Sequence, residues 1–194
     1  MNVHRIAFTG AAGSGKSTCA RYLARKYNFH RLSFANALKD ICQELFGLGD
    51  LVIKSDRERQ LLQKFGVMVR ELDEDAWLRP IAEQLSRGVP DDSYVLDDCR
   101  FNNEAKFLKD NGFKIIQLKR ERRILEGDVA AHESERGIAP EFLDQTIFSD
   151  SVSGLLTAVA GLLDLTGSRL GGKVDSSPDQ STGLSRDIKR VWQS

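Results

Sequence analysis

The stretch FTGAAGSGKST, residues 8–18, constrains the fold of this chain more than any other feature. Its residues Gly10, Gly15, Lys16 and Ser17 fill the pattern G-x-x-x-x-G-K-[ST] completely. Glycines allow successive backbone N–H groups to turn inward around an anion, and the positive end of a helix dipole can face the same anion. The stretch therefore predicts a phosphate-binding loop that joins a buried strand to a helix.

The residues on either side of the loop fit this prediction. Residues 5–9, RIAFT, form a short apolar run that is typical of a buried strand. Apolar residues recur at helical spacing over residues 19–27, so a helix is expected after the loop. This context disfavours the alternative of a glycine-rich turn that binds no nucleotide.

Each position of the loop has an expected role. Lys16 can reach the outer phosphates of a nucleotide, and the Ser17 hydroxyl can hold Mg²⁺. We therefore expect ATP with Mg²⁺ as the phosphoryl donor. The residues expected to bind ATP are Gly13, Ser14, Gly15, Lys16, Ser17 and Thr18.

Four apolar runs alternate with helical stretches along the chain. After residues 5–9, the runs cover about 29–34, 93–98 and 112–118. Strands separated by helices pair in parallel with right-handed crossovers, so we predict an α/β fold with a doubly wound parallel sheet flanked by helices. The interval of about 35–90 is too long for a simple crossover, and it predicts a helical insertion over the ligand edge of the sheet.

Two local signals describe the inside of this insertion. Ser55 and Glu58 fit a capping box that opens a helix. A later helix contains Pro80, which must lie in the first turn of that helix or kink it.

Composition limits the domain number and the partners. A chain of 194 residues fits one domain, here predicted as residues 1–165. Lys+Arg and Asp+Glu are both 28, so nothing attracts nucleic acid or an anionic membrane over a broad surface. Three widely spaced cysteines and the lack of a membrane-length apolar run favour a cytoplasmic protein with small-molecule partners. Residues 166–194 are rich in Gly, Ser and Asp, and they predict a flexible tail.

Acidic residues end the third apolar run, in VLDDCRFNNEA, residues 95–105. Acids at the carboxyl end of such a strand lie beside the phosphate loop. We assign Ser17 and Asp97 to Mg²⁺ and Asp98 to the acceptor, although the sequence leaves the choice between the two aspartates open. Arg100 could bridge donor and acceptor phosphates, and Glu104 could hold it in place. The alternative is that the acids cap the next helix and pair with Arg100.

This sequence lacks the signature motifs of two other classes of phosphate-binding protein. A GTP switch needs Asn-Lys-x-Asp after a later strand, and a transport ATPase carries an LSGGQ-like stretch. Neither stretch is in this sequence. A small kinase remains, and such an enzyme must also hold an acceptor.

Further stretches extend the pattern beyond the loop: FANALKD, LLQKFGVMVRELDEDAW, DDCRFNNEA and HESE. Together they resemble the deoxynucleoside monophosphate kinases of bacteriophages, from the phosphate loop to about Leu163. More distantly, VLDDCR is similar to the strand-end Asp and nearby Arg of adenylate kinases. Arg100 follows Asp97 by three residues, one fewer than in those enzymes, so that alignment needs a gap.

The resemblance implies transfer of the ATP γ-phosphoryl group to a deoxynucleoside monophosphate, in the host cytoplasm if the chain is phage-encoded. The insertion would then bind the monophosphate. The implied substrate-binding residues are Lys39, Arg70, Trp77, Asp98, Arg100 and Glu104. Three of them have ordinary structural alternatives. Lys39 fits a solvated helix residue, Arg70 fits a cation at a helix end, and Trp77 fits the core.

A basic stretch, KRERRILEGDVAAHESERG, follows the fourth run and predicts a lid over about residues 119–137. Arg120 and Arg123 share a helix face and could close over the phosphates, which would exclude water. With Lys16 and Arg100 they complete the expected catalytic set. The alternative is a solvated basic face. HESE, residues 132–135, matches a His-x-Ser-Glu motif of the family, and we assign no chemistry to it.

Two other functions stay open at this point. One is a kinase of another small acceptor, such as dephospho-coenzyme A. The other is an ATP-binding regulatory module that recruits partners through its tail. A homodimer is compatible with either function and with the monophosphate kinase.

Overall fold

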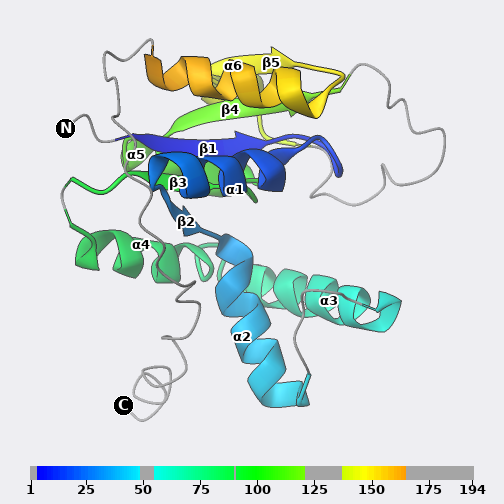
Figure 1. The fold of residues 1–194 in the computed structure, drawn as a ribbon. Helices are drawn as coiled ribbons and strands as arrows, with labels where there is room; N and C mark the ends of the chain where they lie inside the picture. The colour runs from blue at the N-terminus through cyan, green and yellow to red at the C-terminus, as the bar shows by residue number, and fades with distance from the viewer. Residues whose placement is uncertain (1–3, 49–54, 90, 121–136, 165–194) are drawn as a thin grey trace.

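The computed structural model describes residues 4–48, 55–89, 91–120 and 137–164. Within these residues, five strands form one sheet (Figure 1). They are β1 (Arg5–Thr9), β2 (His30–Leu32), β3 (Tyr94–Leu96), β4 (Lys114–Lys119) and β5 (Gln145–Phe148). Their order across the sheet is β2-β3-β1-β4-β5, and all neighbouring strands are parallel. The predicted parallel α/β fold is confirmed.

Helices cover both faces of the sheet. On one face lie α1 (Lys16–Tyr27) and α6 (Val152–Asp164), and on the other lie α4 (Leu78–Arg87) and α5 (Asn102–Asp110). Strand β1 shows why both faces are apolar, since side chains alternate along it. Ile6 and Phe8 pack in the core with α1 and α6, whereas Ala7 packs in the core with α4 and α5.

The chain between β2 and β3 is helical. It contains α2 (Phe34–Phe46), α3 (Asp56–Leu72) and α4, and Figure 1 shows α2 and α3 extending beyond the edge of the sheet. A small core of their own, centred on Cys42 and Leu62, holds α2 and α3 together. Both arms of the predicted capping box are present at Ser55 and Glu58, and Pro80 lies in the first turn of α4.

Two elements differ from the prediction. Strand β2 ends at Leu32, because Phe34 already begins α2. The Asp98 carboxylate accepts the backbone N–H groups of Phe34 (3.2 Å) and Ala35 (2.9 Å) and so caps that helix. Strand β5 was not predicted. Only Ile147 in it is buried, so its sequence carries little apolar signal.

In the part of the chain that the structure describes, no helix is long and apolar enough to cross a membrane.

A short 3₁₀ helix, η3 (Pro140–Phe142), precedes β5. The predicted tail lies outside the described residues. So does most of the predicted lid, including Arg123 and the HESE motif.

Candidate active site

The phosphate loop between β1 and α1 has the backbone that its glycines predict. Gly10, Gly13 and Gly15 have φ values of 133°, 74° and 102°, which side-chain-bearing residues rarely adopt. A Cβ atom at Gly10 would lie 2.4 Å from the carbonyl oxygen of Leu118 in β4. The loop therefore packs so closely against β4 that this position has no room for a side chain.

Lys16 and Ser17 begin the helix that follows the loop. The Lys16 ammonium group donates to the carbonyl oxygens of Gly10 (2.5 Å) and Ala11 (2.8 Å), so its side chain folds back over the loop. Ser17 is exposed in the first turn of α1. The roles of the ammonium group at the phosphates and of the hydroxyl group at Mg²⁺ stay predictions.

The side chains of the two aspartates after β3 lie on opposite faces of the sheet. Asp97 is buried and lies 3.5 Å from Arg31 of β2, measured from its Oδ2 to Nη2. Arg31 is in register with Val95, which packs in the α1 core. Because side chains alternate along a strand, Asp97 faces the same side as Val95 and α1. Asp98 therefore faces the other side, toward α2.

The alternation of Asp97 and Asp98 determines which of the two could hold Mg²⁺ together with Ser17. Mg²⁺ in phosphoryl-transfer sites takes one or two carboxylates, a hydroxyl group, phosphates and water. Ser17 and Asp97 supply a hydroxyl and a carboxylate on the same side of the sheet, so the chemistry of the pair fits that ion. Asp98 is already engaged, because it accepts the Ser33 hydroxyl (2.7 Å) as well as the first N–H groups of α2.

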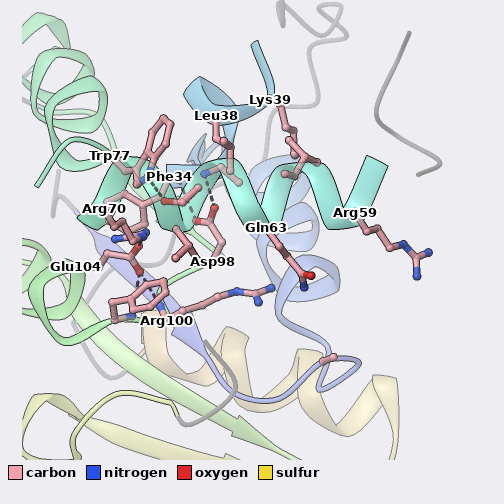
Figure 2. Close-up of a pocket in the computed structure, with 16 residues that line it drawn as sticks. Phe34, Leu38, Lys39, Arg59, Gln63, Arg70, Trp77, Asp98, Arg100 and Glu104 are labelled. Carbon is pink, nitrogen blue, oxygen red and sulfur yellow. Dashed lines mark hydrogen bonds and ion pairs between the residues drawn. The ribbon is translucent and has the colours of Figure 1, made fainter. Parts of the chain in front are cut away.

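A cavity of about 510 Å³ lies between the phosphate loop, α2, α3 and the start of α5 (Figure 2). Ala12 of the loop lines it on one side. Four cations line other parts of it, and they come from α2, α3 and the residues after β3: Lys39, Arg59, Arg70 and Arg100. Apolar side chains and the carboxylates of Asp98 and Glu104 line most of the rest. The volume is within the range of a small-molecule site, and the charge suits an anionic ligand.

Arg70 and Glu104 form an ion pair at the inner end of this cavity. Arg70 is 19% exposed and Glu104 is 1% exposed. The Arg70 guanidinium also lies over the ring of Phe101, with 4.0 Å between its Cζ and the ring centroid. Burial raises the pKa of Glu104, while the Arg70 charge and a backbone N–H bond from Arg100 oppose the rise.

Trp77 lines the same cavity from the start of α4. Its side chain is only 4% exposed, and its indole N–H donates to the carbonyl oxygen of Gly66 in α3 (3.3 Å). The buried indole N–H thus has a hydrogen-bond acceptor on α3. Stacking on a base stays a prediction for this residue.

Arg120 lies beside the phosphate loop. Its Nη2 would be 3.9 Å from a Cβ atom at Gly15. Burial raises the pKa of Cys19, in α1, to about 11, and the nearby Arg120 charge opposes the rise. The cation thus reaches the donor side of the site. Its predicted partner Arg123 is outside the described residues.

Two polar residues that line the cavity, Arg59 and Gln63, were not predicted as site residues from the sequence. They lie one turn apart on α3, and the same face continues through Gly66 to Arg70. That spacing is the signal that could have found them. Figure 2 shows Arg100 reaching across the cavity toward Gln63, whereas Arg70 turns to Glu104.

A parallel sheet with a phosphate loop after its central strand and a cation-lined cavity beside that loop defines a P-loop protein of the kinase-like type. The chain belongs to the family described as AAA domain, whose model matches residues 6–135.

Similar proteins come from large DNA viruses and from bacteria. The chain is 31% identical over 146 residues to "Putative deoxynucleotide monophosphate kinase" of Acanthamoeba polyphaga mimivirus, covering 59% of this chain and 73% of that protein. It is 29% identical over 164 residues to "Uncharacterized protein ORF77" of Ictalurid herpesvirus 1, covering 78% of this chain and 69% of that protein. Among solved structures it is similar to TT1252 from Thermus thermophilus, with 19% identity and a TM-score of 0.49, covering 86% of this chain and 100% of the other.

Proposed function

We propose that this protein transfers the γ-phosphoryl group of ATP to the phosphate of a deoxynucleoside monophosphate, giving ADP and a deoxynucleoside diphosphate. The cavity beside the phosphate loop carries the proposal. It runs from Ala12 of the loop to Lys39 and Arg70 on the helical insertion, with Arg100 between them. An acceptor that already bears a phosphate needs such cations at a distance from the donor loop. The name of the mimivirus relative supports the same acceptor class.

On the donor side, the loop N–H groups and Lys16 hold the phosphates of ATP. Ser17 and Asp97 would hold Mg²⁺, which when bound neutralises charge on the β- and γ-phosphates. The attacking group is a phosphate oxygen that is already ionised. No side chain therefore has to remove a proton, and the residues need only position the two nucleotides and neutralise their charge.

On the acceptor side, Arg70 binds the phosphate of the monophosphate at the inner end of the cavity. Arg100 reaches between the two nucleotides and stabilises the transferring group, where negative charge is redistributed as the bond breaks. Arg120 approaches from the donor side, and Arg123 is proposed to join it when both nucleotides are bound. Exclusion of water then favours transfer to the acceptor over hydrolysis of ATP.

The direct test is a coupled assay of ADP formation with a panel of deoxynucleoside monophosphates, ribonucleoside monophosphates and dephospho-coenzyme A. We expect ADP formation to be stimulated most by one or more of the deoxynucleoside monophosphates. Lys16→Ala should abolish that stimulation, and Lys106→Ala, an exposed change on α5, should preserve it. Stimulation by dephospho-coenzyme A alone would move the protein to another kinase class. Tight ATP binding with no acceptor-dependent turnover would favour the regulatory module.

The predicted homodimer and the predicted cytoplasmic location stay predictions. Size-exclusion chromatography with light scattering would test the first.

A further inference from the structure

Glu104 lies in the first turn of α5, at the inner end of the cavity. Its side chain is 1% exposed, so little of it is accessible to a ligand. Both carboxylate oxygens already have protein partners. Oε1 pairs with Nη2 of Arg70, and Oε2 accepts the backbone N–H groups of Arg100 (2.8 Å) and Phe101 (3.1 Å).

These partners belong to two different parts of the proposed site. Arg70 ends the pocket-lining face of α3, in the helical insertion, whereas Arg100 and Phe101 follow β3 in the sheet domain. The Phe101 ring packs against the Arg70 guanidinium from a second direction. One carboxylate thus contacts both the Arg70 guanidinium and the backbone from which the Arg100 side chain extends.

We propose that Glu104 is a positioning residue that presents Arg70 to the phosphate of the acceptor and fixes its spacing from Arg100. The proposal rests on the function proposed above. Arg70 has a planar guanidinium with several N–H groups, so one edge can stay on Glu104 while another edge binds a phosphate. Glu104 thereby acts on the acceptor through Arg70 and does not touch it.

Glu104→Gln separates this role from simple support of the fold. The amide oxygen of glutamine can still accept the N–H groups of Arg100 and Phe101. The amide NH₂ group would then face Arg70, donor against donor, and release it. We expect the Michaelis constant for the monophosphate to rise about tenfold, with the constant for ATP and the turnover number close to wild type.

The decisive measurement is a double-mutant cycle with Arg70→Ala, read as the Michaelis constant for the monophosphate. If Glu104 works through Arg70, Glu104→Gln adds nothing in the Arg70→Ala background. Additive effects of the two changes would overturn the proposal, as would an unchanged constant in Glu104→Gln alone. Glu71→Gln, an exposed change next to Arg70 on the same helix, is the matched control and should behave as wild type.

A second variant decides the matter if Glu104→Gln does not fold. Arg70→Lys keeps the charge but has no planar fork that can serve Glu104 and a phosphate together. We expect it to raise the acceptor constant, and wild-type kinetics would overturn the proposal. The proposed function fails separately, because in that case the wild-type protein itself would show no ADP formation stimulated by a deoxynucleoside monophosphate.

Discussion

At the scale of single residues, Asp97, Asp98 and Glu104 illustrate what a sequence motif leaves open. All three follow β3 within a few positions, and the sequence offered each of them more than one role. In the structure, Asp98 caps α2 and Glu104 pairs with Arg70. Asp97 lies on the α1 side of the sheet. The role of each acid depends on which face of the sheet it lies on and on which helix packs there. The local sequence does not contain this information.

The pKa of Asp98 leads to a prediction about stability and pH. Desolvation raises this pKa from its ordinary value of 3.8, although hydrogen bonds from Ser33 and Ala35 oppose the rise. Between 3.8 and the native value, the folded state holds a proton that the unfolded state has lost. The contribution of Asp98 to stability therefore falls as pH rises through this window.

We accordingly expect the stability of the wild type relative to Asp98→Asn to decrease as pH rises from about 4 toward 7. Urea unfolding at several pH values for both proteins would measure this difference. An increase with pH would show that the carboxylate is stabilised in the native state, and the desolvation account of Asp98 would then be wrong.

Arg70 and Arg100 should differ in kinetics, because one is proposed to bind the acceptor and the other the transferring group. Arg70→Ala should raise the Michaelis constant for the monophosphate and leave that for ATP nearly unchanged. Loss of one charge-assisted contact costs about 1.5–3 kcal/mol, or roughly ten- to a hundredfold in acceptor efficiency. Arg100→Ala should instead lower the turnover number.

Steady-state kinetics with each substrate varied in turn would check this division. Equal weakening of ATP and monophosphate by Arg70→Ala would show that the helical insertion is not the acceptor site.

At the scale of elements, substitution of glycines tests how tightly the phosphate loop packs against β4. Gly10→Ala forces a Cβ atom against the Leu118 carbonyl at a positive φ, so we expect a loss of about 1–3 kcal/mol in the free energy of unfolding. Gly161→Ala in α6 is the matched control, because the added Cβ atom would meet no heavy atom within 4 Å apart from its chain neighbours and the backbone of its own helix. It should stabilise the protein by about 0.5–1 kcal/mol. Thermal unfolding of both variants checks that Gly10→Ala lowers and Gly161→Ala raises the free energy of unfolding. Equal effects of the two changes would contradict the packing of the loop against β4.

The elements that the sequence predicts best are those with strong local signals. The phosphate loop, the capping box of α3 and the strands β1, β3 and β4 carry dense apolar runs or defined polar patterns. Strand β5 has one buried residue, and the first N–H groups of α2 are capped by Asp98, which is far away in sequence. The missed features thus depend on edge position and on contacts distant along the chain.

At the scale of the whole molecule, the strand order brings the site together. Strand β1 lies between β3 and β4, so the phosphate loop after β1 is flanked by Asp97 and Arg100 after β3 and by Arg120 after β4. The long interval between β2 and β3 allows α2 and α3 to line the other wall of the cavity. The sequence predicts the parallel class and the insertion. Arg59 and Gln63 could have been added as lining residues only through their helical spacing from Arg70, since no motif of their own marks them.

The central claim is that the terminal phosphate of ATP passes to another phosphate. Incubation with ATP labelled in the γ-phosphate and a deoxynucleoside monophosphate, followed by separation of the products, tests it most directly. We predict that the label is recovered in a deoxynucleoside diphosphate, and that Lys16→Ala forms none. Label found only in inorganic phosphate, or in no product at all, would contradict the account.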